Sequence, residues 1–415
     1  MHNLRMTKTV LIAGGGIAGM AVGVAAARAD WQAQILERAP EFYEVGAGVQ
    51  LGPNVTRILQ AWGLTERFKQ VAAFPSVLNA RSMTTGEVLA TLSLKEAVQI
   101  YGAPYVTIHR ADLHDLLLQA ASAQGVQVQT NAQVQRVSQT PAAAVFDVLT
   151  HGQSKQHAAE LAVAADGVWS PLRQQLLDDG PANFTGHIAY RAMVAQADLP
   201  AHMRSQEVSV WMGAHAHVVS YPVRGGDYLN VVCLTEGQLL EADAHNLQAL
   251  QTWNAQKSEV QTLAELQHAL RGACAALTDL VGACRAWRLW PLCGRPAMRG
   301  AHEHAQGRVA LVGDAAHPML PYLAQGAGMA IEDASELGAH LAHSTAADVP
   351  QRLQQFAQAR WQRNARVQNR AVRNGQIFHA TGPMQWGRDL SLRLLGSRVM
   401  DVPWLYGYSG NTARP

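Results

Sequence analysis

Three acidic residues stand where an enzyme could use a carboxylate to bind a ligand. Glu37, Asp166 and Asp314 each come directly after a short apolar run, or one glycine beyond it. Such runs, bounded by glycine or a turn, are typical of buried β-strands. Open α/β sheets bind ligands at the carboxyl ends of their strands. The three acids therefore predict a ligand site at one edge of a parallel sheet.

A glycine-rich turn stands next to the first of these acids. Gly14, Gly16 and Gly19 form a GxGxxG between an apolar strand and an alanine-rich helix over residues 20–29. In such a turn the glycines allow the sharp bend, the approach of a pyrophosphate and close helix packing, and the helix N-terminus favours an anion. Glu37 then stands where an acid binds the ribose of an ADP group. This order predicts a dinucleotide site, although it does not choose between FAD and NAD.

The stretch after Asp314 is a stiff loop that leads into a helix. Pro318 and Pro321 restrict its path, and the glycines within 326–328 allow the backbone to approach a flat group closely. A carboxylate, a stiff loop and a helix N-terminus suit a ribityl chain, a pyrophosphate and a flavin ring better than they suit ordinary core.

A candidate substrate wall lies in the middle of the chain. Residues 208–223 read as one strand of a second sheet. The period of two places Trp211, Gly213, His215, His217, Val219 and Tyr221 on one face. Two histidines, a tryptophan and a tyrosine make a poor solvent face and a plausible wall for an aromatic ligand. The alternative is that His217 is an ordinary core or surface histidine without a role.

Composition narrows the possible classes of protein. The chain has 415 residues, of which 48% are hydrophobic, and a net charge of only +2. This balance does not favour nucleic-acid binding. Its four cysteines show no metal-ligand spacing, so we expect reduced thiols and no metal site. Without a signal segment or an apolar run of membrane-spanning length, the sequence predicts a cytoplasmic protein with no stable membrane association.

An arginine-rich stretch lies near the C-terminus. Residues 351–374 contain six arginines and no acid: Arg352, Arg360, Arg363, Arg366, Arg370 and Arg373. Most are three or four residues apart and so share one helical face. The pattern favours a solvated face over a subunit contact or a membrane-surface stripe.

Together the three acid-bearing motifs resemble those of the single-component FAD-dependent aromatic hydroxylases, the group A flavoprotein monooxygenases. The motifs are GxGxxG with Glu37, Asp166-Gly167-Val168-Trp169-Ser170-Pro171-Leu172-Arg173, and Gly313-Asp314 with its loop. Further segments resemble the salicylate, 3-hydroxybenzoate and 6-hydroxynicotinate hydroxylases: His109-Arg110-Ala111-Asp112-Leu113, Tyr322-Leu323-Ala324-Gln325-Gly326-Ala327, Ile331-Glu332-Asp333-Ala334 and Trp404-Leu405-Tyr406-Gly407-Tyr408.

The resemblance implies an α/β fold of the p-hydroxybenzoate-hydroxylase type. A Rossmann-like FAD-binding domain would be interwoven with a mixed β-sheet substrate domain and followed by C-terminal helices. The FAD-binding domain would comprise residues 1–75, 105–180 and 295–345. The substrate domain would comprise 76–104 and 181–294, and the helical segment 346–415.

The resemblance also implies roles for individual residues. The ADP half of FAD would contact Gly14, Gly16, Ala18, Gly19, Glu37 and Arg38. The ribityl and pyrophosphate region would contact Gln50, Arg110, Asp166 and Asp314, and the flavin pyrimidine ring would face Gly326, Ala327 and Gly328. Pro318 would line the site near the oxygen-reactive edge of the flavin. His217 and Tyr221 would bind the phenolic oxygen of the substrate and assist its deprotonation.

The implied reaction consumes NADH or NADPH and O₂ and hydroxylates a small phenolic ring through a flavin C4a-hydroperoxide. Pro321 stands where some 3-hydroxybenzoate enzymes carry glutamine, which weakens 6-hydroxylation of that acid as the specific reaction. Salicylate, 3-hydroxybenzoate, 6-hydroxynicotinate and a nitrophenol all stay open, as do decarboxylation and a monomeric or homodimeric state. The rival functions are oxidation of a larger hydrophobic substrate, including epoxidation, and non-catalytic binding of a flavin or nucleotide.

Overall fold

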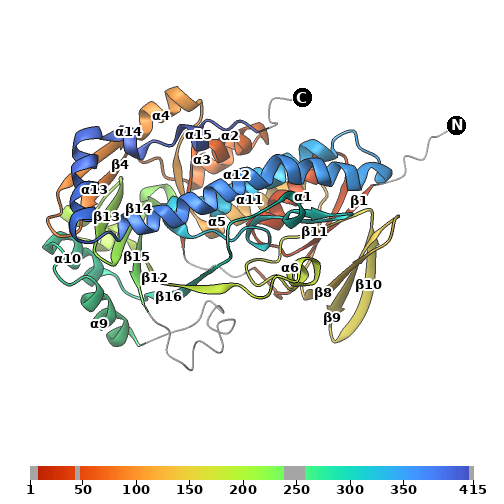
Figure 1. The fold of residues 1–415 in the computed structure, drawn as a ribbon, viewed down its shortest axis with the longest axis horizontal. Coiled ribbons are helices and arrows are strands. Elements are labelled where there is room, and N and C mark those ends of the chain that lie inside the picture. Colours follow the sequence, from red (N-terminus) through yellow and green to blue (C-terminus); the bar gives the residue numbers. More distant parts are fainter. Residues whose placement is uncertain (1–7, 43–46, 238–257, 411–415) are drawn as a thin grey trace.

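The computed structural model describes residues 8–42, 47–237 and 258–410, in which two large sheets are joined by long helices (Figure 1). The first sheet has the order β17–β18–β11–β1–β2–β7. Its strands are β1 Thr9–Ala13, β2 Gln32–Leu36, β7 Gln127–Gln129, β11 Leu161–Ala164, β17 Ala305–Gln306 and β18 Val309–Leu311. All neighbours pair in parallel except β17 with β18. This confirms the predicted α/β class.

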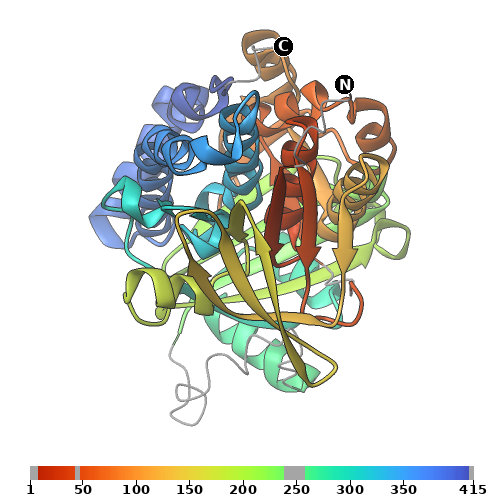
Figure 2. The same cartoon turned by 90° about the vertical axis from the view of Figure 1, so that its right-hand side faces the viewer.

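Both faces of this sheet are covered, because successive side chains of a strand point to opposite sides. Val10 and Ile12 pack beneath helices α1 Ile17–Arg28, α5 Arg110–Ala123 and α11 Gly326–Leu341. Leu11 and Ala13 pack instead against a three-stranded sheet. That sheet consists of β8 Ala132–Gln139, β9 Ala144–Thr150 and β10 Gln153–Ala159. Figure 2 shows this sheet crossing in front of β1. Double coverage explains why the strands read as continuous apolar runs.

The second sheet has seven strands in the order β16–β12–β15–β14–β13–β4–β5. They are β4 Val77–Ser82, β5 Val88–Ser93, β12 Asn183–Ala195, β13 Val208–Gly213, β14 Ala216–Val223, β15 Tyr228–Glu236 and β16 Arg288–Gly294. The prediction of a single strand over 208–223 is wrong, because the chain reverses at residues 214–215 and forms a hairpin. His215 takes a positive φ of 61° there, and no Asn-Gly or Asp-Gly pair marks the turn.

The hairpin changes which side chains share a face. Met212 pairs with His217, and Trp211 pairs with Val218. Directly paired residues point to the same side of a sheet. Trp211 therefore lies on the face opposite His217, and His215 lies in the exposed turn. Of the predicted aromatic wall, only His217 and Tyr221 remain together.

Smaller elements complete the described chain. The strands β3 Gly48–Leu51 and β6 Val106–His109 pair with each other. The remaining helices are α2 Pro53–Ala61, α3 Thr65–Val71, α4 Leu94–Tyr101, α6 Pro171–Leu177, α9 Glu259–Ala269, α10 Ala275–Ala283, α12 Val349–Phe378, α13 Gly382–Leu395, α14 Ser397–Met400 and α15 Pro403–Tyr406. Among the described residues, no helix has the length and apolarity needed to cross a bilayer. The division into domains stays a prediction.

The arginine-rich stretch forms the middle of α12, and the expected solvated face is wrong for part of it. Arg360 is 0% exposed, and its guanidinium donates to Glu332 and Asp333 at 2.8 Å each. Arg363 donates to both oxygens of Glu332 at 2.7 and 2.8 Å. The partner acids belong to α11, so no acid near these arginines in sequence could reveal the pairing.

We predict that Arg360→Leu destabilises the protein by about 3–5 kcal/mol, because it leaves two buried carboxylates without their shared cation. The midpoint of urea unfolding of the purified protein measures the effect. Arg373 is exposed on the same helix. Arg373→Gln is therefore the matched control and should change stability by less than about 0.5 kcal/mol. Equal shifts in the two variants would contradict the importance of the buried pair.

Candidate active site

The glycine turn after β1 combines two tightly packed glycines with one open position. Gly14 has a φ of +99°, and a Cβ there would lie 2.5 Å from the Ala165 carbonyl oxygen. A Cβ on Gly19 would lie 1.9 Å from the Gly14 oxygen, whereas one on Gly16 would meet nothing within 4 Å. The fold itself thus requires Gly14 and Gly19. Gly16 leaves space at the N-terminus of α1, where a pyrophosphate fits.

Glu37, at the end of β2, is fixed beside this turn. Its carboxylate accepts the Gly15 N–H at 2.6 Å and the Ala39 N–H at 2.8 Å. Arg38 is exposed next to it. Oxygens of a carboxylate can accept more than two hydrogen bonds, so Glu37 can still bind sugar hydroxyls. This geometry suits the predicted adenosine end of the site.

Two further carboxylates lie close to the turn. Both oxygens of Asp166 are buried and lack a hydrogen-bond partner among the described residues, and burial raises the pKa of this group to about 6. Asp314 follows Gly313, whose added Cβ would lie 2.9 Å from the Ala18 methyl group. The Asp314 side chain is accessible to solvent. Desolvation by the surrounding protein nevertheless raises its pKa, although the charges of His317 and Arg110 oppose this shift.

The other predicted cofactor residues border the same region. Arg110 begins α5, and burial lowers its pKa while Asp314 favours its charge. Gln50, on β3, accepts the hydroxyl hydrogen of Tyr105 at 2.6 Å. Residues 326–328 form the first turn of α11, where backbone N–H groups have no partner within the helix. An open glycine, unpaired buried carboxylate oxygens and a second helix N-terminus fit FAD.

The register of the second sheet defines a face that we call the ligand face. Residues that pair directly across neighbouring strands point to the same side. The polar members of this face include Arg191 and His187 on β12, Asn230 and Glu236 on β15, Arg288 on β16, and His217 and Tyr221 on β14. Its central apolar members are Ala189, Met193, Val219, Val232, Leu234 and Trp290. The structure therefore places the predicted pair His217 and Tyr221 on one face, around the apolar side chains at its centre.

His217 is almost fully buried, with 1% of its surface exposed. Its Nδ1 lies 2.8 Å from Nε2 of His379, the residue directly after α12. Its ring lies 5.3 Å from that of Tyr322 and 5.2 Å from that of Phe378. Burial, followed by the neighbouring histidines, lowers the pKa of His217 well below its usual value. The imidazole is therefore neutral near pH 7 and can accept a proton.

Tyr221 lies toward the cofactor side of the ligand face. A Cβ on Gly48 would come within 2.5 Å of the Tyr221 ring, so β3 packs directly on this tyrosine. Burial raises the pKa of Tyr221, although Arg191 and Gln50 oppose the shift. The hydroxyl therefore stays protonated and can donate a hydrogen bond. His217 and Tyr221 share a face but have different neighbours.

Arg191 is a candidate site residue that the sequence analysis did not predict. Its guanidinium lies over the Trp290 ring at 5.0 Å, and its buried Nε has no hydrogen-bond partner among the described residues. Burial lowers its pKa, and Tyr221 is the group that favours its charge. A signal was present, because Arg191 is the single charged residue in the apolar run 188–195. A buried cation of this kind is suited to binding an anionic ligand group.

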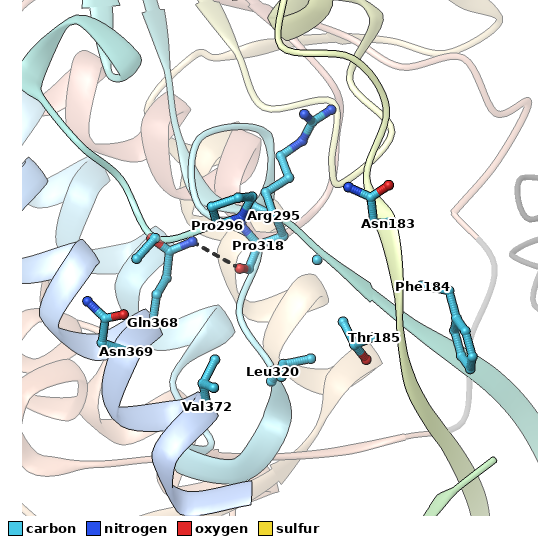
Figure 3. Close-up of a pocket in the computed structure, with 12 residues that line it drawn as sticks. Asn183, Phe184, Thr185, Arg295, Pro296, Pro318, Leu320, Gln368, Asn369 and Val372 are labelled. Carbon is cyan, nitrogen blue, oxygen red and sulfur yellow. Dashed lines mark hydrogen bonds between the residues drawn. The ribbon is translucent and has the colours of Figure 1, made fainter. Parts of the chain in front are cut away.

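Pro318 borders a cavity of about 430 Å³ between the second sheet and α12 (Figure 3). Its carbonyl oxygen accepts a hydrogen bond from Gln368 Nε2 at 3.2 Å. Asn183 and Leu320 also line this cavity, whereas His217 and Tyr221 do not. Leu320 packs against the apolar centre of the ligand face. The loop that begins at Pro318 therefore separates this cavity from the predicted catalytic pair.

Comparisons with known proteins agree with this geometry. The profile of the family described as FAD binding domain matches residues 7–371. The 3-hydroxybenzoate 6-hydroxylase of Polaromonas naphthalenivorans (strain CJ2) is 34% identical over 405 residues, which cover 96% of each chain. The 6-hydroxynicotinate 3-monooxygenase of Bordetella bronchiseptica is 33% identical over 338 residues, covering 79% of this chain and 81% of that protein. A salicylate hydroxylase substrate complex superposes with a TM-score of 0.77 at 25% identity, covering 97% and 96%.

We predict that Gly16→Ala weakens FAD binding without destabilising the FAD-free protein. Its added methyl group meets no protein atom but occupies the space open to the pyrophosphate. Titration of the FAD-free protein, followed by flavin fluorescence, measures the affinity. Gly282, on α10, is equally open and serves as the control. Gly282→Ala should leave the affinity unchanged, and an unchanged affinity in Gly16→Ala would count against the assigned pyrophosphate position.

Proposed function

Because this chain belongs to the FAD binding domain family and is an FAD-dependent aromatic hydroxylase, we propose that its substrate is a small hydroxybenzoate or hydroxypyridine carboxylate. The observation that carries the proposal is the composition of the ligand face. Arg191, His217 and Tyr221 lie on one face of the second sheet, around the apolar side chains at its centre. Their chemistry matches a flat ring that bears one carboxylate and one phenolic hydroxyl.

His217 is suited to accept the proton of the phenolic hydroxyl of the substrate. A phenol becomes a much stronger nucleophile when it loses its proton, and a neutral imidazole is the usual acceptor near pH 7. The lowered pKa of His217 ensures that the ring is neutral before the substrate binds. Tyr221 keeps its own proton and can donate to the phenolic oxygen or to the carboxylate. The pair thus supplies an acceptor and a donor on one face.

Arg191 is suited to bind the carboxylate of the substrate. An arginine buried against Trp290 retains donors for a planar anion and cannot readily lose its charge. A charge-assisted hydrogen bond to a buried partner is about twice as strong as a neutral one. The arginine therefore favours aromatic acids over simple phenols, and the surrounding apolar side chains favour a ring.

FAD, reduced by NADH or NADPH, would supply the electrons that activate O₂, and one oxygen atom of O₂ would be transferred to the ring while the other becomes water. The chain positions this cofactor with the glycine turn, Glu37, Asp166, Asp314 and the first turn of α11. The buried ligand face excludes water from the ring, which protects the reactive oxygen from wasteful release as peroxide. NAD(P)H and O₂ are therefore proposed as co-substrates, with the aromatic acid as the ring that is hydroxylated.

The first test is NADH and NADPH oxidation by the purified yellow protein across hydroxybenzoates, hydroxypyridines and nitrophenols, with peroxide measured in parallel. One aromatic acid should accelerate reductant consumption with little peroxide, and His217→Ala should lose most of that stimulation because its base is gone. If no ring accelerates consumption, or if all of the stimulated turnover ends in peroxide, the proposed substrate class is wrong. A larger hydrophobic substrate then becomes the better hypothesis.

We predict that Arg191→Gln raises the KM for the aromatic acid by roughly 10- to 100-fold, because a charge-assisted hydrogen bond contributes about 1.5–3 kcal/mol. The KM for the same ring without its carboxylate should change by less than about threefold, which makes that phenol the matched control. Steady-state kinetics with both compounds separates the effects. Equal losses for both would show that Arg191 does not bind the carboxylate.

A further inference from the structure

We propose that His379 and Glu236 form a proton relay with His217, which carries the proton of the substrate hydroxyl from the buried ligand face to solvent. The inference rests on the proposed function, since it requires a phenolic ring at His217. His379 and Glu236 act through His217 and not on the ring itself. Neither residue stands out in the sequence, because they lie at the ends of α12 and β15 and meet only in the fold.

The three side chains form a continuous path. His217 Nδ1 lies 2.8 Å from His379 Nε2, and His379 Nδ1 lies 3.3 Å from Glu236 Oε1. The side chain of His379 is only 3% exposed, whereas that of Glu236 is 42% exposed. The path therefore starts at a buried base and ends at a carboxylate that reaches water.

The backbone fixes the outer end of this path. The Glu236 N–H donates to the His215 carbonyl at 2.9 Å, and the His215 N–H donates to the His379 carbonyl at 3.4 Å. The second oxygen of Glu236 lies 2.7 Å from Nδ1 of His215. Strand β15, the β13–β14 turn and the end of α12 are thereby linked around one carboxylate.

Glu236 also determines the tautomer of both relay histidines. An ionised carboxylate can only accept, so His379 Nδ1 carries a hydrogen and donates it to Glu236. His379 Nε2 is then an acceptor and takes the hydrogen of His217 Nδ1. This leaves a lone pair on His217 Nε2, which has no hydrogen-bond partner among the described residues. The relay thus prepares His217 as a base before the substrate arrives.

The charges around the relay favour outward transfer. His187 on β12, His215 in the turn and Tyr322 before α11 are the other titratable groups that face it. Burial lowers the pKa of His217 strongly and that of His379 to about 4. Although partial burial opposes it, His215 and His379 lower the pKa of Glu236 and keep it ionised. A proton is therefore not retained on either imidazole.

Each proton that leaves the substrate is matched by one proton released to solvent. The phenolic O–H bond breaks and an N–H bond forms at His217 Nε2, while the Nδ1 hydrogen moves to His379 Nε2. The Nδ1 hydrogen of His379 moves to Glu236, which releases it to water. One proton leaves the substrate and one enters solvent, and no redox change occurs. To restore the original tautomers, the hydrogen on each of the two imidazoles returns from Nε2 to Nδ1, by ring rotation or by exchange with water, before the next substrate binds.

The test measures proton release on binding, without turnover. The oxidised FAD-loaded enzyme is mixed rapidly with 3-hydroxybenzoate in weakly buffered phenol red near neutral pH, and separately with 6-hydroxynicotinate. The flavin absorbance change reports binding, and the indicator reports the released proton. We expect His379→Ala and Glu236→Gln to slow proton release by about tenfold or more relative to binding.

His202→Gln is the control, because this histidine is exposed between β12 and β13 and lies outside the contacts of the relay. It should keep proton release within about twofold. Glu236 is partly exposed, so Glu236→Gln folds even if His379→Ala is damaged. Proton release at the wild-type rate in both relay variants overturns the relay alone. Failure of every hydroxybenzoate and hydroxypyridine acid of the panel to perturb the wild-type flavin overturns the proposed function instead.

Discussion

A buried ion-pair cluster between α11 and α12 is the interaction on which the rest of the structure depends. Arg360 bridges Glu332 and Asp333, and Asp333 also accepts a hydrogen bond from His317 at 2.5 Å. Although burial alone would raise it, His317 and Arg360 lower the pKa of Asp333. Asn54, on α2, donates to Glu332 at 2.7 Å. Buried charges are tolerated only when they are paired, so this cluster fixes α2, α11, α12 and the loop at His317 in one arrangement.

Both halves of the active site follow from that arrangement. Asp314 and Pro318 flank His317, so the carboxylate and the loop take their positions from the cluster, as does the first turn of α11. In the other direction, α12 extends about 28 Å from Arg360 to His379 at 1.5 Å per residue. The helix carries His379 to the ligand face, as Figure 1 shows for its course across both sheets. One buried cation thus aligns the proposed cofactor loop with the ligand face.

The parts of this protein that could be predicted from its sequence are those determined by neighbours along the chain. The turn at Gly14–Gly19 and the acids at strand ends carry local patterns, and the structure places them together. Arg360 and His379 carry no such pattern, because their partners lie far away in sequence. The sequence analysis did not predict the hairpin at residues 214–215. A period of two continues through a tight turn when no typical turn residues interrupt it. Arg191 could have been predicted from the sequence, because an arginine within an apolar strand is unusual and points to a specific role.

The proposed role of His217 as a base would explain why a path of side chains joins the ligand face to the surface. A base buried among apolar side chains is neutral before binding, as catalysis needs, but the same burial prevents it from keeping a proton. A solvent-exposed imidazole would keep the proton but would admit water beside the reactive oxygen. A path of side chains that ends at a half-exposed carboxylate meets both requirements, because the proton leaves while water stays out. Glu236 lies at the rim of the sheet, where it can pass a proton to water while His379 stays buried.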